Sequence, residues 1–269
     1  MSRFRWNFSS RARELSGGDA IVVSIPKSGR TWLRTFLCAY YCKKIGQEFT
    51  LEPERYGDPR IPRVIYSHDL FEQRTKADGW AWLRGKYLIP SSELRRAKVI
   101  LLVRDPRDAF VSLFVQLTRR TRETAENLKQ KNARELLRDP AFGIVSIVET
   151  MNEWLHEFSV LPPFHMTRYE SLREAPAEHF QTLLTFLDEN PPDSAALDHA
   201  LAFSDFGHMK KLEAAGAFES KILRAGDVAD PESFKVRRGT VGGHRDYLSA
   251  EDLDYAAREM KKLDPRFGY

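Results

Sequence analysis

The chain has 269 residues, of which 42% are hydrophobic and 30% charged, and its net charge is +4. This charge is too small for the length to indicate nucleic-acid binding, although it suits a small anionic ligand. No apolar run approaches the length of a membrane span, and the N-terminus lacks the apolar stretch of a secretory signal. The two cysteines, Cys38 and Cys42, cannot make a disulfide framework or a zinc site. We therefore expect a cytoplasmic protein with one large α/β domain, or conceivably two.

Residues 20–41 predict a buried strand, a tight loop and an amphipathic helix. An apolar run at 21–25 indicates the strand, and Pro26 and Gly29 interrupt it. Apolar side chains then recur at the helical spacings of three and four, at Leu33, Phe36, Leu37 and Tyr40. The loop at 26–31 therefore carries unpaired backbone N–H groups into a helix N-terminus, which is a place that binds phosphate.

The side chains of this loop suit an anion as well. Lys27 supplies a point charge, and Ser28 and Thr31 supply hydroxyl groups. The loop is not a Walker A motif, because its glycine, Gly29, follows the lysine instead of preceding it. An ordinary strand-to-helix turn with a solvated lysine is the alternative interpretation.

A second strand is predicted at 63–66, and it delivers Ser67, His68 and Asp69 at its end. Histidine titrates near neutrality, so His68 is a candidate general base, although it could equally be a polar residue that ends a strand. Residues 86–89 suggest another strand, and residues 90–93 begin a short helix.

The clearest buried strand is at 99–103, and it runs directly into the polar residues 104–108 and a helix through 117. The charged stretch 118–139 is expected to be an exposed helix with a solvated face. Four further elements are predicted: helices at 142–158 and 175–187, a strand at 164–169, and a last helix from a Ser249 cap to Leu263.

Strands that alternate with helices predict a single α/β domain with a central parallel sheet flanked by helices. Ligands of such sheets bind at the carboxyl ends of the strands. Four candidate residues follow four different strands, namely Lys27, His68, Arg104 and Tyr169. We therefore expect them to lie near one another.

A second basic, glycine-rich loop lies at 237–243 and includes Arg237, Arg238 and Gly239. Arginine matches phosphate oxygens bidentately, and glycine lets the backbone approach an anion closely. Together with Arg104 and Ser112, this loop makes a second anion site separate from the first. One nucleotide with phosphates at both ends of its ribose explains both sites.

At this point the sequence resembles the sulfotransferases that use 3′-phosphoadenosine 5′-phosphosulfate (PAPS). Residues 26–32 look like the family's 5′-phosphosulfate loop, residues 103–112 like its 3′-phosphate strand and helix, residues 206–210 like its adenine-covering segment, and residues 237–239 like its closing loop. The chain departs from the common pattern at Arg30, Tyr66 and His244. The motifs occur in family order and cover nearly the whole chain. The resemblance therefore implies a sulfotransferase domain at 19–269 after a basic N-terminal arm at 1–18. It also implies a phosphate-binding strand, loop and helix like those of the P-loop proteins.

The resemblance also implies which residues bind PAPS. The phosphosulfate would contact Lys27, Ser28, Gly29, Arg30 and Thr31. The 3′-phosphate would contact Arg104, Ser112, Arg237, Arg238 and Gly239. The adenine would contact Trp32, Tyr169, Phe206 and Met209.

The implied reaction moves the sulfuryl group of PAPS to a hydroxyl group, possibly an amine, and leaves 3′,5′-ADP. His68 would be the base and Lys27 would stabilise the leaving phosphate, with Asp69 as the reserve candidate for the base. The sequence contains no metal-ligand pattern, so no metal is expected. The acceptor, a small molecule, a glycan or a lipid, and the oligomeric state are not predicted. A nucleotide or small-molecule kinase and a non-catalytic nucleotide-binding protein stay open as alternatives.

Overall fold

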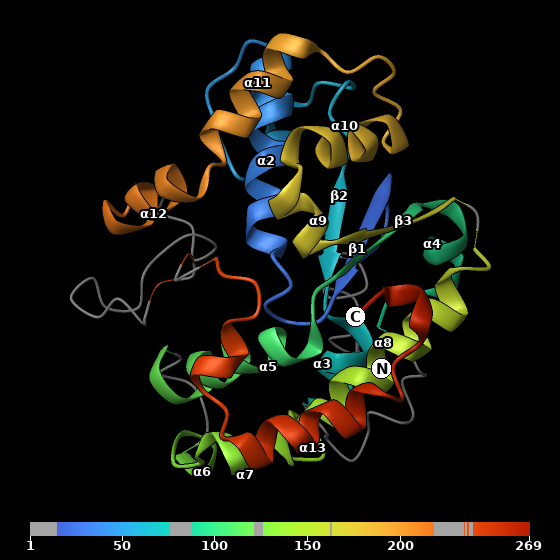
Figure 1. The fold of residues 1–269 in the computed structure, drawn as a ribbon. Coiled ribbons are helices and arrows are strands. Elements are labelled where there is room, and N and C mark those ends of the chain that lie inside the picture. Colours follow the sequence, from blue (N-terminus) through green and yellow to red (C-terminus); the bar gives the residue numbers. More distant parts are fainter. Residues whose placement is uncertain are drawn as a thin grey trace, which may run out of the picture.

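The structure is a computed structural model that describes residues 15–75, 88–120, 126–161, 163–217, 234, 236 and 239–269. At its centre is a parallel sheet of four strands in the order β2-β1-β3-β4 (Figure 1). The strands are β1 Ala20–Ser24, β2 Val64–Ser67, β3 Lys98–Val103 and β4 Phe164–Arg168. This arrangement confirms the predicted α/β fold with a central parallel sheet flanked by helices.

The two central strands are apolar because both of their faces are buried. Ile21 and Val23 of β1 belong to one hydrophobic cluster, whereas Ala20 and Val22 belong to the cluster on the opposite face. The residues of β3 alternate between the same two clusters. Val23 pairs with Ser67, and Val103 pairs with Arg168, so all four strands end at one edge of the sheet.

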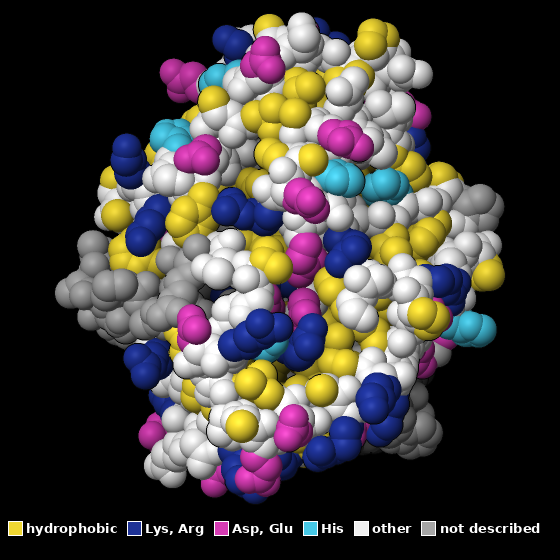
Figure 2. Space-filling model, in the orientation of Figure 1, with side chains coloured by type: hydrophobic (Ala, Val, Ile, Leu, Met, Phe, Trp, Pro, Cys, Tyr) yellow, Lys and Arg dark blue, Asp and Glu magenta, His cyan; other side chains and the backbone are white. Residues whose placement is uncertain are grey.

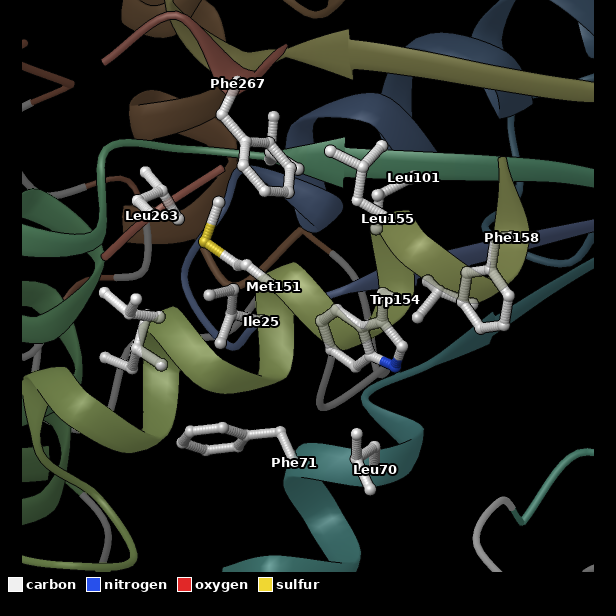
Figure 3. Packing of buried hydrophobic residues seen from close by; sticks show 14 of the residues in the cluster. Ile25, Leu70, Phe71, Leu101, Met151, Trp154, Leu155, Phe158, Leu263 and Phe267 are labelled. Atoms are coloured by element: carbon white, nitrogen blue, oxygen red, sulfur yellow. The ribbon is translucent and has the colours of Figure 1, made fainter. Parts of the chain in front are cut away.

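Helices cover both faces of the sheet. One face packs on α2 Arg30–Lys44, α10 Pro176–Phe186 and α11 Ser194–Phe203. The other face packs on α3 Asp69–Thr75, α5 Pro106–Val115, α8 Ile144–Phe158 and α13 Ala250–Met260. Figure 3 shows Met151, Trp154 and Leu155 of α8 between Leu101 of β3 and Phe71 of α3. The sheet is therefore buried between two helical layers.

The remaining helices are short. They are the 3-10 helix at Pro53–Tyr56, α4 Ser91–Arg96, a π-helical turn at Gln116–Arg120, α6 Glu126–Lys129, α7 Ala133–Leu137, α9 Tyr169–Glu174, α12 Phe206–Ala214, and 3-10 turns at Gly243–Asp246 and Pro265–Phe267. No helix among the described residues is both long and apolar enough to cross a membrane.

The prediction of one exposed helix over 118–139 is wrong. The described part of this stretch is a π-helical turn followed by α6 and α7, and Asn132 starts α7 with a capping box that involves Glu135. Its charges are also partly paired, because Arg134 bonds Glu251 and Arg138 bonds Asp252 across to α13. The stretch is therefore docked on the C-terminal helix.

Two further expectations concern residues at the limits of the described ranges. Leu88 and Ile89 are not in a strand, so the strand predicted at 86–89 is wrong at its described end. Residues 1–14 of the expected basic arm lie outside the described residues. Leu15 is buried in the main core, and the backbone N–H of Gly17 donates to Glu93.

Candidate functional site

The loop between β1 and α2 has the backbone of an anion-binding turn. Lys27 and Gly29 both adopt left-handed conformations, with φ of 73° and 93°. Left-handed residues within a turn direct successive N–H groups toward one side and make a concave anion site. Gly29 is the N-cap of α2, no side chain caps this helix, and its first turn contains no acidic residue. The N–H groups of that turn therefore point at the end of the loop with a favourable helix dipole.

Gly29 is required here for a second reason. A Cβ atom at this position would lie 2.5 Å from Cδ2 of Tyr169, so the Tyr169 ring packs directly against the glycine backbone. Ser28, which lies between Lys27 and Gly29 in the sequence, is fully buried. Its Oγ has no hydrogen-bond partner among the described residues. A buried hydroxyl without a partner is costly in a folded protein, and a bound oxyanion would supply an acceptor for it.

His68 lies at the end of β2, beside the end of β1. Its Nδ1 is 2.7 Å from the carbonyl oxygen of Ser24. A carbonyl oxygen only accepts hydrogen bonds, so Nδ1 carries the proton and Nε2 carries the lone pair. The bond therefore favours this tautomer of the neutral ring, and its acceptor, Ser24, ends β1 three residues before Lys27.

Asp69 has a different environment from its neighbour. It is fully buried, and its two carboxylate oxygens accept the backbone N–H groups of Leu88, at 2.7 Å, and Ile89, at 3.1 Å. These bonds explain why residues 88–89 are not a strand, because their N–H groups are taken by a side chain. The contacts give Asp69 a structural role, and they favour His68 over Asp69 as the base.

An Asp69→Ala variant should therefore lose stability more than chemistry. Removing a carboxylate that accepts two backbone bonds is expected to lower the free energy of unfolding by about 2–4 kcal/mol. Denaturant unfolding measures this loss, and kcat per folded molecule should fall far less than in a His68→Ala variant. A loss of kcat as large as that of His68→Ala, in enzyme that is still folded, would instead make Asp69 the base.

Arg104 joins the first loop to the C-terminal part of the chain. It follows β3, and its Nη1 and Nη2 donate to the carbonyl oxygens of Lys27, at 3.0 Å, and Thr240, at 3.1 Å. Its guanidinium also lies 4.5 Å from the centre of the Tyr169 ring. The Nε of Arg104 is buried and has no hydrogen-bond partner among the described residues. A donor thus remains for a ligand between the two loops.

Aromatic rings form a row beside these loops. Trp32 meets Tyr169 edge to face at 5.8 Å, and the guanidinium of Arg173 lies 5.7 Å from the Trp32 ring and 5.6 Å from the Phe206 ring. Phe206 packs against Gly239, where a Cβ atom would come within 2.6 Å of its ring. The row spans the site from the first loop to the C-terminal loop. The planar guanidinium of Arg173 lies near two of its rings, those of Trp32 and Phe206.

Two residues next to this row complete its description. Arg173 was not predicted, and only its position one helical turn after Tyr169 on α9 could have indicated it. Met209 is buried in a small cluster with Cys38 and Leu51, and Trp32 packs against that cluster. The expected contact of Met209 with adenine stays a prediction.

A buried carboxylate holds the C-terminal loop. Asp108 of α5 accepts hydrogen bonds from the backbone N–H of Gly242, at 2.7 Å, and from the backbone N–H and ring Nδ1 of His244, at 2.9 and 2.7 Å. Burial raises the pKa of the Asp108 carboxyl, but the bonds from His244 and Gly242 together with the Arg104 charge hold it below its usual range. Sequence reasoning noted His244 only as a departure and did not single out Asp108.

The structure thus brings most predicted site residues to one edge of the sheet. They are Lys27, Ser28, Gly29, Arg30, Thr31, Trp32, His68, Arg104, Tyr169, Phe206 and Gly239. Ser112 lies on α5 one turn after Asp108, on the same side of the helix. Arg237 and Arg238 lie outside the described residues. Figure 2 shows Lys and Arg side chains beside Asp and Glu side chains across the middle of the face that carries these loops.

Within the described ranges, no group of three or more His, Cys, Asp or Glu side chains is arranged to hold a metal ion.

Comparison with known proteins gives a consistent result. The chain matches the sulfotransferase domain family over residues 18–263. It is 26% identical to a 3-alpha-hydroxysteroid sulfotransferase of Cavia porcellus, over 88% of this chain and 80% of the relative, and 24% identical to cytosolic sulfotransferase 13 of Arabidopsis thaliana, over 94% and 79%. Among solved structures it is similar to a retinol dehydratase in complex with androsterone and inactive cofactor PAP, with a TM-score of 0.61 and 18% identity over 90% of this chain and 79% of that one.

Proposed function

Because the chain belongs to the sulfotransferase domain family and is a sulfotransferase, we propose that it moves the sulfuryl group of PAPS to an acceptor hydroxyl, with His68 as the general base and Lys27 stabilising the leaving phosphate. One observation supports the role of His68. Its Nδ1 bonds the carbonyl oxygen of Ser24, the last residue of β1, so in the neutral ring Nε2 carries the lone pair that a base needs.

The proposed step balances without a further reactant. Nε2 of His68 takes the proton of the acceptor hydroxyl while the acceptor oxygen attacks sulfur in line. The bond between sulfur and the bridging phosphate oxygen breaks, and its electron pair leaves with 3′,5′-ADP. The products are a sulfate ester, 3′,5′-ADP and a proton on His68, which passes to solvent.

Lys27 and the 26–31 loop suit the charge that develops on the leaving phosphate. Transfer through a loose transition state builds charge on the bridging oxygen, so donors directed at that place contribute most in the transition state. The left-handed backbone at Lys27 and Gly29 and the uncapped start of α2 provide such donors. Lys27 adds a full charge next to them.

The nucleotide fits the remaining contacts. Trp32 and Phe206 would stack on adenine with Tyr169 at its edge, as their positions in the aromatic row support. Arg104, Ser112 and the loop that contains Gly239 would hold the 3′-phosphate. The unpartnered Ser28 Oγ and Arg104 Nε are the two buried donors that such a ligand would satisfy.

A preference for the 3′-phosphate tests this assignment. We expect 3′,5′-ADP to bind at least roughly 10²-fold more tightly than 5′-AMP, because each charge-assisted bond contributes about 1.5–3 kcal/mol and about 1.4 kcal/mol is tenfold. Calorimetric titration without Mg²⁺ measures both affinities. ATP is the comparison ligand, since a kinase would prefer it.

Arginine variants refine that test. Arg104→Ala should erode the preference and leave the 5′-AMP affinity nearly unchanged. Arg107→Ala is a matched control, because the hydrogen bonds of its guanidinium among the described residues go to Asp105, the shortest at 2.6 Å, and not to either loop. Equal wild-type affinities for 3′,5′-ADP and 5′-AMP would contradict the proposed nucleotide site.

We propose that the acceptor is a small molecule with a hydroxyl group, and the name of the Cavia porcellus relative, a 3-alpha-hydroxysteroid sulfotransferase, supports this choice over an amine or a glycan. A cytoplasmic location is proposed on the name of the Arabidopsis thaliana relative. A screen of hydroxyl, amine and glycan acceptors with ³⁵S-labelled PAPS tests the acceptor, and label transferred only to amines or only to glycans would refute it.

A further inference from the structure

One buried side chain fixes the loop that closes the nucleotide site. Asp108 is 3% exposed and lies in the first turn of α5, and among the described residues the hydrogen bonds to its carboxylate come from residues 242–244. Its Oδ2 accepts the N–H of Gly242, and its Oδ1 accepts both the backbone N–H and the ring Nδ1 of His244. The carboxylate thus replaces, for this loop, the hydrogen bonds that regular secondary structure would supply.

The same carboxylate lies next to Arg104. The distance between Arg104 Nη2 and Asp108 Oδ2 is 4.0 Å, and the same Nη2 donates to the carbonyl oxygen of Thr240 at 3.1 Å. Thr240 precedes the anchored residues by two positions. Asp108 therefore holds the loop at residues 242–244 while Arg104 holds it at Thr240, and the two charged groups attract each other.

The ring of His244 adds a side-chain bond to the anchor. His244 is 3% exposed, and its Nδ1 must carry a proton to donate to a carboxylate. A buried histidine with this bond adds a side-chain contact to the two backbone contacts, so the 242–244 turn is fixed by three donors on one acceptor group.

We propose that Asp108 is a positioning residue for recognition of the 3′-phosphate. It does not bind the nucleotide, but it holds the loop of residues 239–244 and Arg104 in the arrangement that does, and His244 is the side chain through which the loop is anchored. The inference rests on the proposed nucleotide site and assigns its closing loop a dedicated anchor.

The expected effect follows from the cost of ordering a loop. When the anchor is removed, the binding-competent loop is populated only part of the time, and the apparent affinity falls by that fraction. Only ligands that use the loop carry this cost. Affinity for 3′,5′-ADP should therefore fall while affinity for 5′-AMP, which lacks the 3′-phosphate, should not.

The first experiment uses Asp108→Asn in the full chain. We expect the dissociation constant for 3′,5′-ADP to rise roughly 10- to 100-fold, since bonds to a charged acceptor are lost, and that for 5′-AMP to change less than about threefold. The KM for PAPS should rise similarly, with kcat at saturating PAPS reduced less than about tenfold. Asp252→Asn is the control, because Asp252 is also a buried helix carboxylate, bonded to Ser249 and Arg138 away from the site. It should lower Tm but preserve the ratio of the two nucleotide affinities.

A second pair of variants covers the case in which Asp108→Asn does not fold. His244→Asn retains an N–H donor near the position of Nδ1, whereas His244→Leu has none. We expect His244→Leu to weaken 3′,5′-ADP binding about tenfold and His244→Asn to restore it to within about threefold of wild type.

The outcomes separate this inference from the function on which it rests. If wild type does not prefer 3′,5′-ADP to 5′-AMP, the proposed nucleotide site is wrong and the inference falls with it. If wild type has the preference but folded Asp108→Asn and His244→Leu retain it in full, the inference alone is overturned. An equal loss for both nucleotides would also overturn it, since that result indicates a merely structural role.

Discussion

Replacing His68 with alanine is expected to lower kcat by roughly 10²- to 10⁴-fold while 3′,5′-ADP still binds, because the acceptor hydroxyl then has no general base. The residues proposed to bind the nucleotide lie elsewhere, in the loop before α2, on α2, α5, α9 and α12, and at Arg104 and Gly239, so its affinity should be little changed. Steady-state kinetics and calorimetry on the same preparation measure the two quantities. In wild type, kcat should rise with pH as the base loses its proton, and this dependence should disappear in the variant.

Two further variants separate base chemistry from the hydrogen bond to Ser24. His68→Asn keeps an N–H donor in reach of the Ser24 carbonyl but has no equivalent of Nε2, so it should be as inactive as His68→Ala. His199→Ala is the control, because His199 lies on α11, outside the proposed nucleotide site, and its ring packs on Phe203. Its kcat should stay within about threefold of wild type. A His68→Asn variant with near-normal kcat would remove His68 from the proposed chemistry.

Removing the charge of Lys27 is expected to lower kcat by roughly 10²- to 10³-fold, the effect typical of losing one donor to a developing oxyanion. Lys27→Met is the informative change, because it keeps the unbranched stem and imposes the same backbone requirement at φ of 73°. Nucleotide affinity should fall less than kcat, since charge on the leaving phosphate grows during transfer. The Lys27 carbonyl oxygen that accepts from Arg104 belongs to the backbone and survives the change.

Lys27→Gly controls for the conformation of the loop. Glycine adopts a left-handed backbone without strain, so this variant removes the charge and relaxes the turn at once. Equal kcat losses in the methionine and glycine variants would assign the effect to charge. A loss confined to the KM for PAPS would contradict the role of Lys27 in the transition state.

The central part of the fold could be predicted because local sequence and tertiary environment agree there. The apolar runs of β1 and β3 are buried on both faces, and the breakers Pro26 and Gly29 mark the loop as the structure has it. The Ser249 cap of α13 was also predicted and accepts the N–H of Asp252. In contrast, α11 was not predicted. It packs closely on α2 through small residues such as Ala196 and Ala200, which give little periodic signal.

The strand prediction at 86–89 was wrong at its described end because a side chain from another part of the sequence determines the backbone hydrogen bonding there. Leu88 and Ile89 have strand-like side chains, yet Asp69 takes their N–H groups. Within the site, the phosphate-loop residues are contiguous and were recognised together. Asp108 and His244 lie far apart in the sequence, and each has an ordinary local context, so their pairing could not be predicted from one sequence.

The hydrogen bonds of Arg104 also bear on how the product leaves. Its Nη atoms each donate one N–H to a backbone carbonyl, that of Lys27 or of Thr240, so the guanidinium is already held in place. A guanidinium has five N–H groups, so Nε and the second N–H of each Nη remain for a phosphate. Under the proposed function, the two carbonyl bonds would therefore persist while the 3′-phosphate binds and departs, and release of 3′,5′-ADP would require no rearrangement of Arg104.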